Sequence, residues 1–333
     1  MTAALDLAIS DSAFDASMRT GLAAVEERLR AAVQQTDRLA DAASRHLVEA
    51  GGKRVRPMLT LLAAHLGDAQ RPEVLDAAVV VELTHLATLY HDDVMDSAPL
   101  RRGAPSAHEV WGNTVAILTG DLLFARASAI VAELGPEAVR IQSSTFERLC
   151  LGQLHETMGP GPDEDPVDHY LTVLADKTGS LIATSGRFGA MFAGCGPDVV
   201  DVLVRYGERV GVAFQLADDV IDLASGGAES GKTPGTDLRE GVPTLPVLLL
   251  RGAAADGDGA AREVARLLDG DLSDDGRLAE VVAALGVHPV MDAARAAAAQ
   301  WASDAVDALH PLPEGPAKAA LRDFAEALVV RSR

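Results

Sequence analysis

A helical period runs through almost the whole chain, and this feature limits the possible folds more than any other. Apolar residues recur at spacings of three and four, as Leu22, Val25, Leu29 and Val33 do. Alternating β-branched stretches, which would indicate strands, are lacking. We therefore predict an all-α fold, a large helical bundle with helices over 23–33, 55–66, 74–94, 115–134, 138–154, 167–192, 199–223, 244–254, 261–268, 276–285, 289–309 and 316–330.

Glycine and proline separate these predicted helices, and most of the gaps are short, as is usual in helix bundles. The exception is the long Gly-rich segment 225–243, which suggests a functional loop or lid. No composition break or repeat of fixed period divides the chain. We expect a single domain over 1–333, with 1–20 as a poorly ordered or peripheral N-terminal segment.

The overall charge excludes general binding of nucleic acid. Lys and Arg total 29 against 49 Asp and Glu, a formal net charge of −20, whereas phosphate backbones need a basic surface. The two cysteines, Cys150 and Cys195, exclude a disulfide scaffold, and we expect them to be buried small hydrophobes. Residues 1–10 do not resemble a signal peptide, and the longest apolar run, 242–250, is too short to span a membrane. These observations predict a cytoplasmic protein.

Two acidic motifs share one spacing. Asp92 and Asp96 lie four residues apart on a predicted helix, and Asp218 and Asp222 repeat the DDxxD pattern farther along the chain. Carboxylates at this spacing face the same side of a helix and repel each other, so apolar surroundings demand a counter-charge. Hard oxygen ligands without clustered His or Cys favour Mg²⁺, which usually shares phosphate oxygens of a substrate. A solvated acidic face is the alternative for either motif alone.

Basic residues that could bind the phosphates of such a substrate are also present. Lys53 and Arg56 lie at a predicted helix start after two glycines, where backbone N–H groups favour an anion. Arg101 and Arg102 follow the first acidic motif. Beside carboxylates that hold a metal, these groups indicate diphosphate binding rather than a solvated turn.

Taken together, these segments resemble the trans-isoprenyl diphosphate synthases, or polyprenyl synthetases, over residues 22–330. The motifs stand in the family's order: GGKRVRP, HLATLYHDDVMD, LRRG, GD at 120–121, KTG, FQLADDVID and GKTPGTDL. The resemblance implies an all-α isoprenoid synthase fold with a central substrate cavity. It also implies Mg²⁺-dependent, head-to-tail condensation of an allylic diphosphate with isopentenyl diphosphate, a prenyltransferase activity, with more than one ion in each active site.

The resemblance also implies roles for individual residues. For metal binding they are Asp92, Asp96, Asp218 and Asp222, supported by Asp93 and Asp219. For the allylic diphosphate they are Arg101, Lys177 and Lys232, and for isopentenyl diphosphate Gly52, Lys53, Arg56, His85 and Arg102. Thr178 and Gln215 would lie near the developing cation, and Gln153 is a further candidate. The released diphosphate would accept the proton. Lys318 is left as a surface residue, and Val242 stands where many relatives have another lysine.

The residues before the first motif bear on product length. Thr84 and Thr88 precede Asp92 by two turns and one turn, with Ala87 beside them, so these three are expected to form a wall for the growing chain. In the family, large aromatic residues four or five positions before the motif stop growth early, whereas Thr88 and Ala87 are small. The motif also lacks the two-residue insertion frequent in short-chain bacterial farnesyl synthases. We expect an all-trans product longer than twenty carbons, made for a quinone side chain.

Alternatives remain open from sequence. A shorter-chain geranylgeranyl or farnesyl diphosphate synthase shares all of these motifs. A class I terpene cyclase shares the first acidic motif but does not need GGKRVRP or the second DDxxD. A non-catalytic subunit of a heteromeric synthase should have lost its carboxylates, and a zinc site near His85 and His91 lacks the usual ligand patterns. The family commonly forms homodimers, and an apolar product suggests transient membrane contact for its release.

Overall fold

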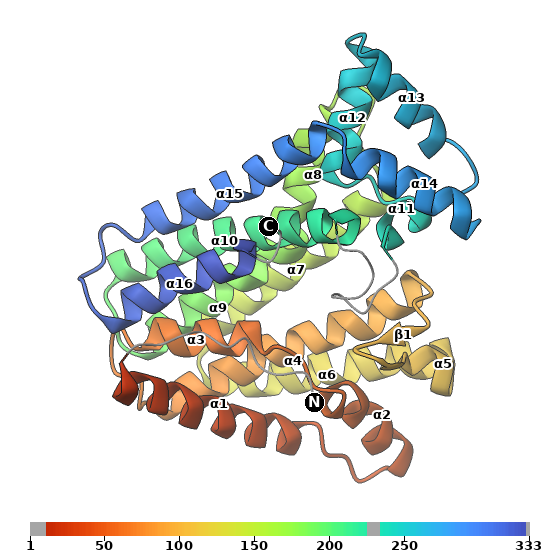
Figure 1. The fold of residues 1–333 in the computed structure, drawn as a ribbon. Coiled ribbons are helices and arrows are strands. Elements are labelled where there is room, and N and C mark those ends of the chain that lie inside the picture. The colour runs from red at the N-terminus through yellow and green to blue at the C-terminus, as the bar shows by residue number, and fades with distance from the viewer. Residues whose placement is uncertain (1–10, 225–233, 331–333) are drawn as a thin grey trace. The chain divides into compact units, whose positions relative to one another are not determined.

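Helices dominate a computed structural model of the chain, which describes residues 11–224 and 234–330. The all-α prediction is confirmed. The elements in chain order (Figure 1) are α1 (Ser12–Ala32), α2 (Arg38–Glu49), α3 (Val55–Ala64), α4 (Pro72–Met95), β1 (Leu100–Arg101), β2 (Ala104–Pro105), α5 (Ala107–Trp111), α6 (Asn113–Glu133), α7 (Pro136–Met158), α8 (Pro166–Leu174), η1 (Ala175–Gly179), α9 (Ser180–Phe192), α10 (Pro197–Ala224), α11 (Thr236–Glu240), α12 (Leu245–Ala255), α13 (Gly259–Leu268), α14 (Asp275–Gly286), α15 (Val290–Ala308) and α16 (Pro316–Val330).

The N-terminal part differs from the prediction. Helix α1 begins at Ser12, where Asp11 accepts hydrogen bonds from two backbone N–H groups, and it buries Phe14 and Met18. Residues 12–20 therefore belong to a packed helix rather than to a peripheral segment, while residues 1–10 lie outside the described part. Helix α2 was not predicted, although Asp37 caps it in the same way.

Two later segments also differ in detail. The predicted helix 167–192 is divided into α8, η1 and α9, because residues 175–179 form a π-helical turn. Of the predicted loop 225–243, residues 236–240 form the short helix α11, and 225–233 lie outside the described residues. Strands β1 and β2, which no sequence pattern indicated, pair as a two-residue antiparallel hairpin around Arg102 and Gly103.

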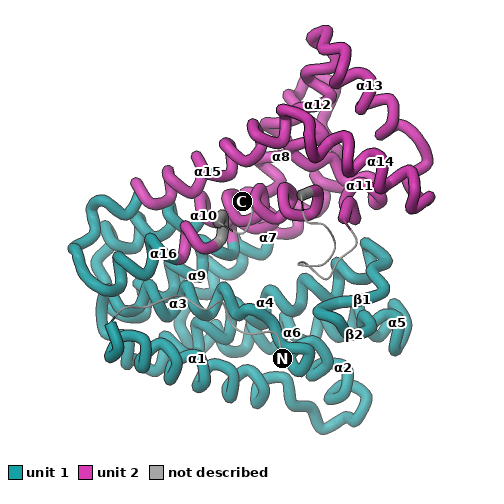
Figure 2. Tube along the Cα trace, viewed as in Figure 1, with its two compact units in different colours: residues 1–147, 181–207, 308–323 teal, residues 148–180, 208–307, 324–333 magenta. Residues whose placement is uncertain are grey.

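The chain divides into two compact units, drawn in different colours in Figure 2. Unit 1 comprises residues 1–147, 181–207 and 308–323. Unit 2 comprises 148–180, 208–307 and 324–333. The single domain expected from sequence stays a prediction.

Helix α4 lies at the centre of unit 1 and packs against α1, α3, α5 and α6. Its sequence from Ala77 to Leu86 is apolar on nearly every side, which is the pattern of a buried helix. Close approach of α4 to α6 depends on Gly120, since a Cβ there would lie 3.1 Å from the Ala87 carbonyl oxygen and 2.6 Å from a His91 ring carbon. The first acidic motif lies at the C-terminal end of this packed helix.

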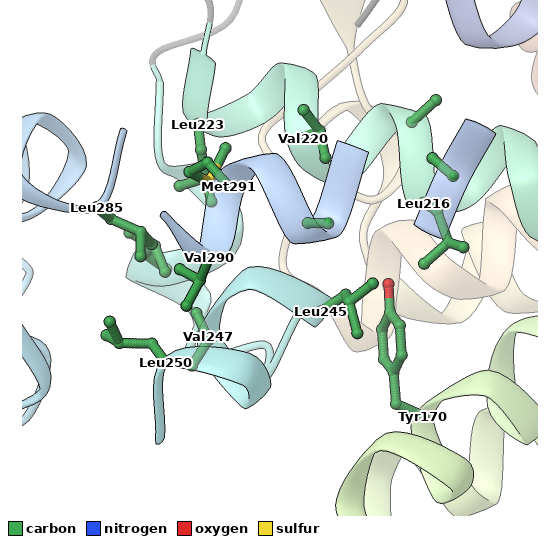
Figure 3. Close-up of a cluster of buried hydrophobic side chains, with 14 of the residues drawn as sticks. Tyr170, Leu216, Val220, Leu223, Leu245, Val247, Leu250, Leu285, Val290 and Met291 are labelled. Carbon is green, nitrogen blue, oxygen red and sulfur yellow. The ribbon is translucent and has the colours of Figure 1, made fainter. Parts of the chain in front are cut away.

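Unit 2 has an apolar cluster that joins α8, α10 and α12–α15 (Figure 3). Leu216, Val220 and Leu223 extend from α10 into this cluster, so the face of α10 that they share is buried. Tyr170 stands near Leu245 with its hydroxyl pointing away from α8. The second acidic motif lies on the same stretch of α10 as these apolar residues.

Helix α6 corrects the expectation that 242–250 is the longest apolar stretch. Among the described residues it is the one single helix long and apolar enough to cross a membrane, and the bent pair α14 and α15 passes the same test when taken together. Only a third of the most apolar 18-residue stretch of α6 is buried, and Ile117 and Leu118 are exposed. Length and composition of this kind also occur in core helices of soluble proteins.

Lys318 is a second correction, because it is buried rather than a surface residue. Its Nζ donates to the Leu312 carbonyl at 2.9 Å, to the His310 carbonyl at 3.3 Å and to Glu314 Oε1 at 2.6 Å. Carbonyl groups of the turn before α16 thus bind the Lys318 ammonium group, which the sequence alone would place at the surface.

Gly189 on α9 provides a test of the packing in unit 1. A Cβ there would clash with the Thr60 carbonyl oxygen and lie 2.8 Å from the Ala63 Cβ, both on α3. Gly189→Ala should therefore lower the free energy of unfolding by about 2–3 kcal/mol. Denaturant unfolding followed by circular dichroism measures this. The matched control is Gly252→Ala, where a Cβ meets no atom within 4 Å and helix propensity should add about 0.5–1 kcal/mol. Equal stability of the two variants would contradict the close approach.

Candidate active site

The loop before α3 has an unusual backbone. Gly51 and Gly52 have φ values of 85° and 147°, and Arg54 adopts the left-handed conformation at φ 50°. A residue with a side chain pays about 1–2 kcal/mol for this conformation, so other contacts must hold Arg54 there. The helix begins only at Val55, which leaves Lys53 outside it and Arg56 inside its first turn.

Arg54, which the sequence did not single out, supplies those contacts. Its guanidinium is buried and pairs with Glu26 at 2.8 Å and Glu82 at 3.0 Å, and it also donates to the Val48 carbonyl at 3.1 Å. Burial acts to lower the pKa of Arg54, but the two carboxylates raise it above its ordinary value. Arg54 therefore fixes the loop and stays charged.

Arg102 closes the same loop from the β1–β2 hairpin. It donates to the Gly51 carbonyl and, at 3.0 Å, to the Leu47 carbonyl. A Cβ on Gly52 would lie 2.8 Å from the Arg102 Cζ, so only glycine allows this approach. The resemblance places Gly52 in the site. In the structure, the absence of a side chain at Gly52 leaves space for the Arg102 guanidinium.

Positive charge is concentrated around His85. Burial first, and then Arg56, Arg102 and Arg101, hold the pKa of His85 well below 6.5, so the ring is neutral at neutral pH. Burial also lowers the pKa of Arg56 to about 10, with Arg102 acting in the same direction. The Arg56 Nε is buried and has no hydrogen-bond partner among the described residues. An anion here would relieve repulsion and satisfy that donor.

The first acidic motif ends α4 within reach of this charge. Asp92 is half-buried and raises the pKa of Arg56, whereas Asp96 is the exposed C-cap of the helix. Asp93 is fully buried, and Arg101 Nε donates to it at 2.6 Å. Burial raises the pKa of Asp93, and its Oδ2 has no hydrogen-bond partner in the described part. Asp93 therefore holds Arg101 in place.

The second acidic motif lies inside α10, away from a helix end. Asp218 and Asp222 are half-buried, and the backbone N–H of Asp237 donates to Asp222 Oδ2 at 3.3 Å. Asp219 is buried and accepts a hydrogen bond from the Tyr170 hydroxyl. Burial raises the pKa of Asp219 to about 8. The middle acid is again turned inward, and the outer pair faces the other side of the helix.

Unit 2 also gathers the residues expected near the allylic group. Lys177 and Thr178 lie in the π-helical turn η1, where Lys177 pairs with Glu156 of α7. The Thr178 hydroxyl donates to Gln215 Oε1 at 3.4 Å, and Gln215 lies one helical turn before Asp219. Lys232, the remaining candidate of this set, lies outside the described residues.

The proposed chain-length residues differ in burial. Thr84 is fully buried, donates to the Val80 carbonyl at 2.8 Å and accepts from Gln142 Nε2 at 2.6 Å. Gln142 lies on α7, so Thr84 joins α4 to that helix. Ala87 is fully buried beside α6, and Thr88 is only half-buried.

The two cysteines are less buried than expected. Cys150 is exposed and Cys195 is intermediate, so neither is the fully buried hydrophobe expected. Gln153 is half-buried, and its Oε1 lacks a hydrogen-bond partner among the described atoms. His91 contacts Asp121 at 3.3 Å rather than another histidine, which does not support a zinc site.

Known proteins with similar sequences and folds decide the family. A family model described as "Polyprenyl synthetase" matches residues 37–285. Nonaprenyl diphosphate synthase of Mycobacterium tuberculosis is 46% identical, over 97% of this chain and 96% of its own length. Heptaprenyl diphosphate synthase component 2 of Geobacillus stearothermophilus is 37% identical, over 91% and 93%. This chain belongs to the polyprenyl synthetase family.

The fold of this polyprenyl synthetase agrees with solved relatives. The crystal structure of geranylgeranyl pyrophosphate synthase from Corynebacterium glutamicum, complexed with calcium and isoprenyl diphosphate, is 42% identical with a TM-score of 0.85. The match covers 97% of this chain and 98% of that one. The sequence resemblance to prenyl diphosphate synthases is confirmed, and the chain is a prenyltransferase.

The donor set of this synthetase fits divalent ions that share their ligands with a substrate. No three His, Cys, Asp or Glu side chains in the described ranges form a cluster able to hold a metal alone. Mg²⁺ is commonly held by one or two carboxylates, with waters and substrate phosphates completing its shell. Two carboxylates per motif are therefore a sufficient protein contribution when a diphosphate is bound.

The low pKa of His85 predicts a pH dependence of stability. Unfolding exposes the ring and returns its pKa to about 6.5, so below that pH the unfolded state binds a proton that the folded state does not. Stability should fall as the pH drops from 6.5, by up to about 1.4 kcal/mol per pH unit. Denaturant midpoints from pH 5 to 7.5 measure this, with His85→Gln as the control that removes the group. Parallel curves for wild type and His85→Gln would contradict a neutral His85.

Proposed function

We propose that this prenyltransferase condenses an allylic prenyl diphosphate head to tail with isopentenyl diphosphate, giving an all-trans product longer than twenty carbons. The observation that carries the reaction is the pairing of two DDxxD motifs with a concentrated cationic cluster in an acidic chain. The product length is supported by the nonaprenyl and heptaprenyl synthases among its relatives. Small residues at Ala87 and Thr88 agree with it, and a quinone side chain is the proposed destination.

The isopentenyl diphosphate is proposed to bind the cationic cluster. Arg56 and Arg102 would face its phosphates together with Lys53. His85, kept neutral by its surroundings, can donate one hydrogen bond without adding to the repulsion among the arginines. The room beside Gly52 lets the loop backbone approach the anion.

The allylic diphosphate is proposed to bind divalent ions, Mg²⁺ in the cell, held by Asp92, Asp96, Asp218 and Asp222. Ions held there would neutralise the charge that develops on the leaving diphosphate. Arg101 would add a guanidinium held by Asp93, and Lys177 and Lys232 would each add an ammonium group. Lys177 has three donors, and its pairing with Glu156 uses one of them.

Departure of diphosphate leaves an allylic cation, which the chain must stabilise without reacting with it. The Thr178 hydroxyl and the Gln215 amide carry dipoles but no charge, and their hydrogen bond fixes both orientations. The double bond of isopentenyl diphosphate then attacks the cation, and the released diphosphate accepts the proton. No side chain of the described residues is needed as the base.

Assembly is part of the proposal. We propose a homodimer, because α6 exposes Ile117 and Leu118 at 42% and 60% on a largely apolar helix. The relative named as a component of heptaprenyl diphosphate synthase makes a heteromeric complex the alternative. Light scattering of the purified chain separates a monomer from a dimer. The proposed compartment is the cytoplasm, with transient membrane contact as the apolar product leaves.

Product analysis by mass spectrometry tests the function. The purified chain receives Mg²⁺, labelled isopentenyl diphosphate and, separately, geranyl, farnesyl or geranylgeranyl diphosphate. A ladder that ends above twenty carbons supports the proposal, and a ladder that ends at or below twenty indicates the shorter-chain synthase, which the Corynebacterium relative favours. Diphosphate released without use of label would indicate a cyclase, and no turnover would indicate a subunit that needs a partner.

Removal of a metal-binding acid should abolish turnover and spare the fold. Asp92→Ala and Asp218→Ala are each expected to lower kcat at least about 10²–10³-fold, because charge on the leaving diphosphate loses its counter-ion. The thermal midpoint should hold or rise, since each change relieves repulsion within a motif. The control is Asp201→Ala, an exposed acid of α10 outside the motif. Near-normal activity of Asp92→Ala or Asp218→Ala would refute the assignment.

Metal removal tests the same assignment without a substitution. EDTA should abolish wild-type turnover, and excess Mg²⁺ should restore it.

Product length should respond to the side chain at position 88. Thr88→Phe is expected to shorten the product by one or more isoprene additions, because it places a ring one turn before Asp92 on the same helix face. Thr88 suits this test better than fully buried Ala87, where a ring would overpack the contact of α4 with α6. Thr88→Val is the matched control of similar size. An unchanged ladder from Thr88→Phe would show that this position does not contact the chain.

A further inference from the structure

The π-helical turn η1 is an irregular element that carries two of the proposed site residues. It covers Ala175–Gly179 and includes Lys177 and Thr178. A π turn adds one residue to a helical turn, is uncommon, and often occurs at functional sites. Neighbouring groups must hold it, since the ordinary α-helical path through the same residues would turn both side chains to other directions.

Two helices of unit 2 approach the backbone of this turn directly. A Cβ on Gly152 of α7 would lie 2.7 Å from the Lys177 nitrogen and 3.1 Å from the Asp176 Cβ. On the opposite side, a Cβ on Gly179 would lie 3.2 Å from the carbonyl oxygen of Glu208 on α10. Glycine at both contacts lets the turn fit between the two helices.

Arg148 joins all three elements. It precedes Gly152 by four residues on α7, so both lie on one face of that helix. Its Nε donates to Asp176 Oδ1 at 2.7 Å, and one Nη donates to Glu208 Oε1 at 2.5 Å. The other Nη donates to Glu208 Oε2 and to the Ala175 carbonyl, both at 3.2 Å. The guanidinium thus binds the first two residues of the turn and the helix behind it.

This arrangement requires the shape of arginine as well as its charge. Only a planar guanidinium offers donors in three directions at once, and lysine provides a single charged point. The hydrogen bond to Glu208 raises the pKa of Arg148, so the group stays charged.

We propose that Arg148 is a positioning residue for prenyl transfer: it holds the π-helical turn so that Lys177 and Thr178 face the allylic substrate. This inference rests on the proposed function, which assigns Lys177 to the diphosphate and Thr178 to the developing cation. Arg148 itself touches neither substrate in this account. It acts through Asp176 and Ala175, which directly precede Lys177 in the chain.

The partial exposure of the Arg148 ion pairs distinguishes a positioning role from a role in stability alone. Side chains of Arg148, Asp176 and Glu208 remain 35%, 20% and 30% exposed, and none belongs to the apolar cluster of unit 2. Partial exposure to solvent limits what these ion pairs contribute to stability, although the bidentate contact of Arg148 with Glu208 retains part of it. Loss of Arg148 should therefore appear in turnover more than in unfolding.

Three variants and one control test the proposal in the full chain. Arg148→Gln should lower kcat between about 10- and 100-fold, as misplaced catalytic groups do. KM for isopentenyl diphosphate should stay within about twofold, because its proposed residues lie elsewhere in the chain. Hydrolysis of the primer to prenyl alcohol, measured as a fraction of turnover, should rise. Arg148→Lys should not restore kcat. Arg251→Gln, which removes the exposed ion pair between Arg251 on α12 and Asp269 at the end of α13, should match wild type.

The double variant Arg148→Gln/Glu208→Gln separates positioning from folding. It removes the carboxylate that Arg148→Gln leaves without a partner, so the thermal midpoint should recover while kcat stays low. Recovery of kcat together with the midpoint would overturn the proposal, as would wild-type kcat in Arg148→Gln or full rescue by Arg148→Lys. Wild-type chain without condensation activity would instead overturn the proposed function, and this inference with it.

Discussion

Repulsion among like charges is the constraint on which the rest of the structure depends. Burial first, and then the nearby charges of Arg56, Arg102, Arg101 and Arg54, hold the pKa of His85 well below 6.5. Such a group of cations is unfavourable unless each member is held by its own partner. Glu26 and Glu82 hold Arg54, Asp93 holds Arg101, and backbone carbonyls of 47 and 51 hold Arg102. Much of the polar interior of unit 1 thus serves to keep positive charge in one place.

Both acidic motifs consist of one buried middle acid and an outer pair of acids. The middle residues, Asp93 and Asp219, are buried and receive hydrogen bonds from Arg101 and Tyr170. The outer residues face away from those partners, because positions four apart share one side of a helix. A DDxxD sequence therefore combines an inward anchor with an outward pair, and only the outward pair is proposed to bind ions.

The sequence predicted features that depend on local periodicity. Helix positions and the shared face of each carboxylate pair follow from spacing, whereas the family was indicated by the resemblance of seven ordered motifs. The sequence did not indicate α2 or the burial of Lys318, although the cap of α2 at Asp37 and the partners of Lys318 at 310–314 lie close to them in sequence. It also did not indicate the π turn, which depends on contacts distant in the chain. Arg54 and Arg148 were missed for the same reason: an arginine's role depends on which carboxylates and carbonyls surround it, and Glu82, Asp176 and Glu208 are brought near only by folding.

The place of the first motif at the end of α4 has a consequence for the stability of that helix. Asp92, Asp93 and Asp96 occupy the last turn and the C-cap, where the negative end of the helix dipole disfavours anions. Neutral or basic residues would make a more stable helix end. Asp93 offsets this cost through its ion pair with Arg101, and the helix dipole alone would favour neither Asp92 nor Asp96. Acids at this helix end therefore lower its stability, which agrees with the metal-binding role proposed for Asp92 and Asp96.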